Sequence, residues 1–402
     1  MAPWLAARFG RHEGIDLSPE QRCLVLLARG DLTPESQDGA LSLLRQPLAW
    51  RVIAHRAYEH GVFPTVVRNL RRLGWPAVPA EIREGLEATV RLNAVRNTLL
   101  GRSLRTALGR FGQAGIPVIP LKGVALAESL YGDVTLRVCS DVDILVPRHA
   151  VEHALELLQA DGYRSADRYH VGATEIDRLL RSSMEYGLVS PPASLHHLLE
   201  LHWDIAWRWR ADSRMVDDLW AGARHGTVLS VEAWVLSPEW ELLYLAVHAA
   251  RHRWSVLKWL VDIHEVCVRG GLNWAGVEDR ARRFGLERAL HLSLATCQAL
   301  LGTPLPPELR GHAPPRRLRA LSAAPVSVGG WREVLSAVGM FRRPADKLRY
   351  LGRLLLQPAL AEWQLIRFPP GLGFLYYPLR PVRLGITSTW AMVRAGLGRL
   401  HL

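Results

Sequence analysis

Two aspartates separated by one residue are the feature of the sequence best suited to chemistry. Asp141 and Asp143 lie in the run Ser140-Asp-Val-Asp-Ile-Leu-Val146. The run predicts a strand over 141–146, in which alternate side chains share a face, so both carboxylates point the same way. Two neighbouring carboxylates repel unless a cation lies between them, and hard oxygen ligands suit Mg²⁺ or Mn²⁺ with a phosphate substrate. An exposed strand edge without metal is the alternative.

A lysine and a glycine stand about twenty residues before this strand. Lys122 and Gly123 separate a β-branched run, Ile116 to Leu121, from a helical pattern, Val124 to Tyr131. Glycine lets a phosphate approach the backbone, and the first N–H groups of a helix attract anions. This turn therefore suits phosphate binding, with Lys122 adding a point charge. An ordinary strand-to-helix turn is the alternative.

A third acidic group occurs in a later predicted strand over 198–206. Glu200, His202 and Asp204 alternate with apolar residues there and share one face. Glu200 is the better third carboxylate because Leu residues flank it, and Asp204 is the alternative. His202 either supports a metal ligand, contacts substrate, or is a hydrogen-bonded structural residue.

The elements that must position these residues fall into four regions. Residues 1–112 read as an N-terminal helical region, 113–210 as an α/β core, 211–310 as a helical bundle and 311–402 as a basic aromatic tail. Strand and helix patterns alternate only within the core. We therefore expect an α+β fold: a small mixed sheet flanked by N-terminal and C-terminal helical regions.

A second group of polar and aromatic residues lies in the predicted bundle. His248 and His252 are four residues apart on a helical pattern, but no Glu stands between them as in the metalloprotease motif, so we expect no zinc there. Trp259 and Asp262 share a stripe of the next predicted helix. We expect this helix to pack on the α/β core and to form one wall of the substrate pocket.

The composition excludes several classes of protein. The chain has 402 residues, of which 49% are hydrophobic and 22% charged, which fits a folded protein of two or three domains. The sequence contains no long uncharged apolar run, so we expect neither a signal peptide nor a membrane-spanning helix. The four cysteines are far apart and lack metal-ligand spacing, which indicates a reduced, cytoplasmic setting: Cys23, Cys139, Cys267 and Cys297.

Much of the net charge of +12 lies near the C-terminal end. Residues 340–402 hold ten Lys and Arg residues against Asp346 and Glu362, interleaved with aromatic residues. The segment either packs on the protein as a basic extension or lies on an anionic membrane surface, which would place the protein peripherally at the inner membrane. Nucleic acid is the least favoured partner, because no known binding module is present.

The motifs described so far resemble a known family. The stretches "LKGVALAESLYGDVTLRVCSDVDILV" and "LELHWDI" are similar to an uncharacterised bacterial nucleotidyltransferase family of the DNA polymerase β-like nucleotidyltransferase superfamily. The resemblance covers about residues 20–310. Where the superfamily usually has Gly-Gly or Gly-Ser at the phosphate turn, this chain has Lys122-Gly123-Val124, and the narrower family shares that feature.

The resemblance implies transfer of a nucleoside monophosphate from an NTP, with two Mg²⁺ (or Mn²⁺) ions. Asp141, Asp143 and Glu200 would be the catalytic metal ligands. Four of the residues that would bind the nucleotide are Lys122, Gly123, Ser140 and His202. Arg137 matches the family's arginine and would contact the triphosphate or brace the aspartate pair, with a structural salt bridge as the alternative.

The sequence leaves the acceptor unidentified: a hydroxyl or amine of a small molecule, a peptide or a protein would fit. Two other functions remain open: phosphoryl or pyrophosphoryl transfer by the same fold, and a nucleotide-binding or membrane-surface accessory protein with little turnover. An enzyme requires Glu200 close to the aspartate pair. A distance above about 6 Å from both Asp141 and Asp143 would argue against two-metal catalysis.

Overall fold

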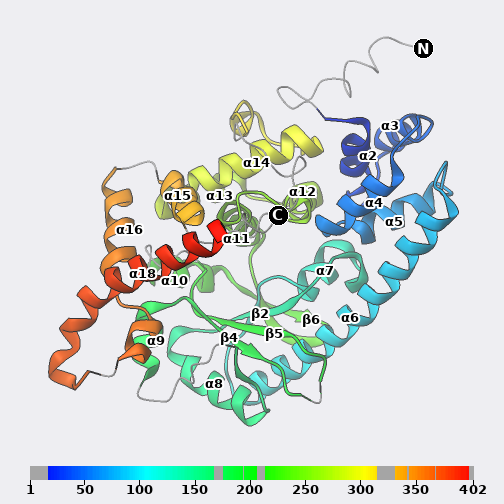
Figure 1. The fold of residues 1–402 in the computed structure, drawn as a ribbon. Helices are drawn as coiled ribbons and strands as arrows, with labels where there is room; N and C mark the ends of the chain where they lie inside the picture. The colour runs from blue at the N-terminus through cyan, green and yellow to red at the C-terminus, as the bar shows by residue number, and fades with distance from the viewer. Residues whose placement is uncertain are drawn as a thin grey trace. The chain divides into compact units, whose positions relative to one another are not determined.

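The computed structural model describes residues 17–166, 175–192, 194–205, 213–314, 331–341, 344–366 and 368–397 (Figure 1). The chain divides into two compact units. One contains Met1–Asp143 and Asp217–Ser327, and the other Ile144–Val216 and Val328–Leu402. The four regions expected from the sequence stay a prediction. Residues 1–16, where a signal peptide would lie, are outside the described residues.

The N-terminal region is helical, as predicted. Its first helix starts at Pro19 because the Ser18 hydroxyl accepts a hydrogen bond from the Gln21 N–H while the Gln21 side chain bonds back to the Ser18 N–H. The helices are α2 Pro19–Leu27, α3 Pro34–Leu44, α4 Trp50–Glu59, α5 Phe63–Arg72 and α6 Ala80–Gln113. Helices α4 and α5 are separated at Gly61, which takes a left-handed φ of 64°.

The central sheet is small and mixed, which confirms the predicted fold class. Its strands run in the order β1-β2-β5-β4-β3. The run predicted as a strand over 116–121 is reduced to β1, because Pro117 and Pro120 have no N–H to donate. The elements are β1 Ile119–Pro120, α7 Val124–Tyr131, η1 Val134–Leu136, β2 Asp141–Leu145, η2 Arg148–Ala150, α8 Val151–Ala160, β3 Arg164–Ser165, α9 Ile176–Ser182, β4 Glu185–Val189 and β5 Leu198–His202.

Strands β4 and β5 are antiparallel, and their register decides which polar residues meet. Glu185 lies opposite His202, and Gly187 lies opposite Glu200. The strand predicted over 198–206 is shorter in the structure, because β5 ends at His202. Ala206 lies outside the described residues. Cross-strand neighbours lie within side-chain reach, so the register places a carboxylate beside His202.

A two-stranded hairpin follows the helix α10 Ser213–Gly222 and has no counterpart in the sequence prediction. It consists of β6 Arg224–Val228 and β7 Val231–Val235. Its turn residues Leu229 and Ser230 have φ of 51° and 64°, a conformation usually taken by Gly or Asn. The Leu229 N–H donates to the carboxylate of Glu128, 2.7 Å away, which supports the turn from α7.

Helices follow the hairpin, in the region where the sequence predicts a helical bundle. They are α11 Pro238–Arg251, α12 Leu257–Arg269, α13 Trp274–Phe284 and α14 Glu287–Leu301, followed by the short η4 Pro307–Leu309. Ser237 caps α11 by accepting from the Trp240 N–H, and Gly285 and Gly302 end α13 and α14 in the left-handed conformation. Many apolar side chains of these helices are buried, and Ser293 is a polar residue buried among them.

The basic tail is also helical where it is described. Its elements are α15 Trp331–Met340, α16 Pro344–Leu356, α17 Leu360–Leu365, η5 Pro370–Leu375 and α18 Tyr376–Leu397. The buried carboxylate of Glu362 pairs with Arg380 at 3.1 Å and with Arg383. None of the helices in the described ranges has both the length and the apolar character needed to cross a membrane. All four cysteines are free and buried.

Candidate functional site

Strand β2 presents the aspartate pair as the sequence predicts. Asp141 and Asp143 are two residues apart in the strand and share a face. The Asp143 side chain is fully buried, whereas that of Asp141 remains 23% exposed. Ser140 donates its hydroxyl to Asp141 Oδ1 at 3.0 Å. The strand thus holds one carboxylate inside the protein and one at its surface.

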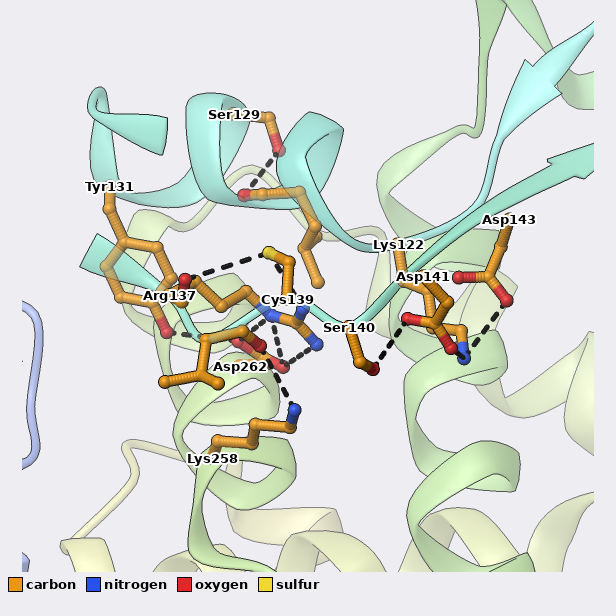
Figure 2. Close-up of polar contacts among 12 residues, drawn as sticks. Lys122, Ser129, Tyr131, Arg137, Cys139, Ser140, Asp141, Asp143, Lys258 and Asp262 are labelled. Atoms are coloured by element: carbon orange, nitrogen blue, oxygen red, sulfur yellow. Dashed lines mark hydrogen bonds and ion pairs between the residues drawn. The ribbon is translucent and has the colours of Figure 1, made fainter. Parts of the chain in front are cut away.

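Lys122 is the positive charge between these carboxylates. Its Nζ lies 3.0 Å from Asp143 Oδ1 and 3.5 Å from Asp141 Oδ2, as Figure 2 shows. The Lys122 side chain is 14% exposed. A buried carboxylate is costly unless it is paired, so the ammonium group compensates for the repulsion between the two acids.

Gly123 allows helix α7 to begin beside β2. It has a φ of 71°, and a Cβ built on it would lie 3.2 Å from the main-chain oxygen of Asp141. Both the backbone conformation and the close approach therefore disfavour any side chain there. The helix that starts at Val124 has free N–H groups in its first turn, at the end where its dipole is positive. This turn suits phosphate binding.

Arg137 lies in a buried network. Its Nε and Nη2 donate to the carboxylate of Asp262 at 3.0 to 3.1 Å, and the Tyr131 hydroxyl donates to Asp262 Oδ1 at 3.1 Å (Figure 2). Burial alone would lower the pKa of Arg137, but the charge of Asp262 raises it well above its ordinary value. The structure thus shows the salt bridge, and contact of Arg137 with a triphosphate stays a prediction.

Lys258 holds the segment that leads into β2. From the first turn of α12 its Nζ donates to the main-chain oxygen of Val138 at 3.0 Å. Burial, followed by repulsion from Arg137, lowers its pKa to about 8. A lysine that is partly desolvated in this way costs stability while it is charged.

We expect this cost to appear as a pH dependence of stability. In the unfolded chain the lysine keeps its ordinary pKa of 10.5, so that state binds the proton more tightly. Between pH 8 and 10.5 the free energy of unfolding of the wild type, relative to Lys258→Met, rises by up to about 3 kcal/mol. Urea denaturation of both proteins at the two ends of this range measures the change. A difference that stays constant with pH would contradict the prediction.

Strands β4 and β5 provide the second acidic group. His202 is buried, with Nδ1 3.3 Å from Glu185 Oε2 and Nε2 3.6 Å from Glu200 Oε2. A neutral imidazole that donates its Nδ1 proton to Glu185 would leave the Nε2 lone pair for a cation bound between His202 and Glu200. Glu185 was not expected from the sequence, because only the strand register reveals that it lies opposite His202.

Asp143, Glu200 and His202 form a candidate metal site. One ligand atom of each lies within 4.8 Å of the others. The carboxylates of Asp143 and Glu200 therefore lie closer than the distance of about 6 Å that would argue against two-metal catalysis. The group includes His202 and does not include Asp141, whose role as a metal ligand stays a prediction. Asp204, the alternative third acid, instead accepts the N–H of Ile205 at 2.7 Å beyond the end of β5.

Comparison with known proteins agrees with these features. The model of a family described as an uncharacterised nucleotidyltransferase matches residues 46–302, which is more than half of the chain. The chain belongs to this nucleotidyltransferase family. The predicted membership is thus confirmed at the level of the family, while the DNA polymerase β-like superfamily and a bacterial origin stay predictions.

One solved structure is also similar to this nucleotidyltransferase-family chain. It is an antigenic nucleotidyltransferase-like protein from Paracoccidioides brasiliensis, with 14% sequence identity and a TM-score of 0.33. The match covers 52% of this chain and 94% of that one. No curated protein matches the chain significantly.

Proposed function

We propose that the protein transfers a nucleoside monophosphate from an NTP to a hydroxyl or amine acceptor. The acceptor atom attacks the α-phosphorus, the bond from that phosphorus to the bridging oxygen breaks, and pyrophosphate leaves. The proton of the acceptor passes to the carboxylate of Glu200. The family membership and the cluster of Asp143, Glu200 and His202 support this proposal.

The donor set fits a divalent cation. Carboxylate oxygens suit Mg²⁺ and Mn²⁺, and an imidazole nitrogen also suits Mn²⁺. Two such ions, when bound, would place positive charge at the triphosphate and at the attacking and leaving oxygens. Asp141, Asp143 and Glu200 are the proposed ligands, with His202 completing the set.

The remaining residues act on the substrate. Gly123 and the first N–H groups of α7 bind the phosphates, and Lys122 adds a positive charge beside them. Ser140 orients Asp141 through its hydrogen bond. We propose that Arg137 acts mainly as a positioning residue, because the buried carboxylate of Asp262 already engages its guanidinium.

The test is transfer of label from NTPs labelled with ³²P at the α- or the γ-phosphate. The protein is incubated with Mg²⁺ or Mn²⁺, with and without an extract of small molecules and proteins. Products labelled only from the α-position support nucleotidyl transfer. Products labelled only from the γ-position would replace it by phosphoryl transfer. Nucleotide binding with no labelled product from any acceptor would favour the accessory protein.

We expect Glu185 to strengthen metal binding through His202. Replacement of Glu185 by Gln removes the charged partner of Nδ1, so the imidazole becomes a poorer ligand. Affinity for Mn²⁺ should fall about 10- to 100-fold. Electron paramagnetic resonance of free Mn²⁺ measures this without any turnover. The control is Glu152→Gln on the exposed face of α8. Equal affinities of the two variants would count against a role for Glu185.

We also propose that the tail binds an anionic membrane surface. Most of the large apolar side chains that are exposed in the described ranges lie between residues 335 and 386, including Leu348 at 70% and Phe374 at 63% exposure. Arg and Lys residues are interleaved with them. Apolar side chains beside basic ones suit the boundary between anionic headgroups and acyl chains.

Sedimentation with vesicles tests the membrane proposal. The full chain should sediment with phosphatidylglycerol vesicles and not with phosphatidylcholine vesicles, and salt should weaken the binding. Phe374→Ser with Tyr377→Ser should reduce binding about tenfold or more, since each change removes buried apolar area. Tyr58→Ser with Leu92→Ser, which alters exposed residues of the N-terminal helices, is the control. Failure to sediment with either lipid would reject the proposal.

A further inference from the structure

Three aromatic rings meet where α11 ends and α12 begins. His248 lies in the last turn of α11, and His252 is the residue directly after its end. Their ring centroids are 4.8 Å apart. Trp259 faces both from α12, with its ring centroid 5.1 Å from that of His248 and 4.8 Å from that of His252. All three residues are only partly buried. The cluster is therefore not closed into the apolar core.

The turn between the two helices fixes this arrangement. Arg253 and Trp254 take left-handed φ values of 57° and 51°, which are unfavourable for residues with side chains. Trp254 is held by donation of its Nε1–H to Ser293 Oγ at 2.8 Å, and Ser293 donates to Ala246 at 3.1 Å. Such strain persists only where the surrounding structure imposes it, often at ligand sites.

The cluster lies close to the phosphate-binding turn. Lys258, the residue before Trp259, reaches Val138, three residues before Asp141. Burial and then the charge of Lys122 lower the pKa of His248 well below its usual range. The charge of Lys122, which pairs with the aspartates, thus acts on His248, and α12 joins the cluster to the segment that leads into β2.

The two imidazoles are neutral at physiological pH. Burial, together with Arg251 and Lys122, lowers the pKa of His252 to about 4. Within the described part of the chain, neither imidazole makes a side-chain hydrogen bond or an ion pair. Each imidazole thus keeps one N–H donor and one nitrogen acceptor without a charge. Such a surface suits an uncharged, flat, hydrogen-bonding ligand and does not suit another phosphate.

We propose that His248, His252 and Trp259 bind the base of the nucleotide whose phosphates lie at Lys122 and Gly123. This inference rests on the proposed function and adds to it the place of the nucleobase. A base is joined to its triphosphate through a single ribose, so a base site must adjoin the phosphate site. Nucleobases stack on Trp and His side chains, and the imidazole nitrogens can bond their edges.

The test compares binding of nucleotide and of inorganic tripolyphosphate by calorimetry in the presence of Mn²⁺. Trp259→Ala and His252→Ala should weaken binding of the NTP that the wild type prefers about 10- to 100-fold. Affinity for tripolyphosphate, which has no base, should stay unchanged. Trp259→Phe should keep most of the NTP affinity because it keeps an aromatic face. Tyr58→Ala, on an exposed part of α4, is the control, and thermal melting checks that each variant is folded.

Two results would overturn this inference but leave the proposed function standing. One is an NTP affinity that Trp259→Ala and His252→Ala leave unchanged, and the other is an equal loss for NTP and tripolyphosphate. A wild-type protein that binds neither probe would overturn the proposed function and the inference with it. The two failures are therefore distinguishable.

Discussion

Asp143→Asn should lower nucleotidyl transfer by about a thousandfold or more. The Asp143 carboxylate is fully buried, lies 3.0 Å from the Lys122 ammonium and belongs to the candidate metal site. Asparagine keeps the shape of the side chain but loses its charge. Charge stabilisation by bound metal ions supplies several kcal/mol to such a transition state, and about 1.4 kcal/mol corresponds to a factor of ten in rate.

The label-transfer assay with α-³²P NTP measures this loss. Asp177→Asn is the matched control, because that carboxylate is 83% exposed and lies on α9. Asp141→Asn should also impair transfer, since Asp141 shares the face and the lysine partner of Asp143. Circular dichroism establishes that the variants are folded. Activity of Asp143→Asn within tenfold of the wild type would exclude Asp143 as an essential metal ligand.

Asp262→Ala should destabilise the protein by about 3–5 kcal/mol. Asp262 and Arg137 are both buried, and the aspartate accepts hydrogen bonds from Arg137 and Tyr131. Removal of the aspartate leaves an uncompensated buried guanidinium and a partly buried tyrosine hydroxyl without its acceptor. The free energy of unfolding from urea denaturation, monitored by circular dichroism, measures the loss.

A double variant separates the charge effect from a simple packing effect. Arg137→Met together with Asp262→Leu replaces the ion pair by apolar groups of similar size, which is often nearly neutral for stability. The double variant should therefore be more stable than Asp262→Ala. If Asp262→Ala costs less than about 1 kcal/mol, the pair does not brace the segment before β2.

The candidate site was predictable where it depends on local pattern. Alternation of acids with Val142 and Ile144 predicts β2, and this period alone places Asp141 and Asp143 on one face. The glycine at 123 before an apolar helix predicts the strand-to-helix turn, because few other residues take its backbone conformation. These features depend on neighbours within a few residues.

The hairpin β6–β7 shows where local pattern fails. Its turn residues, Leu229 and Ser230, give none of the usual Gly or Asn signal. The bond from Leu229 N–H to Glu128 joins residues about a hundred positions apart, and it supports a turn that the local sequence does not favour. Such a contact leaves no periodic trace in the sequence.

The sequence by itself determined the family, the strand that carries the aspartates and the glycine turn, because periodicity, backbone preference and motif spacing are local properties. Only the tertiary structure decided the partners of the charged residues. It paired Arg137 with Asp262 and placed Glu185 beside His202. The physical reason is that burial makes an unpaired charge costly, while the residue that pairs with it is chosen by strand register and helix packing.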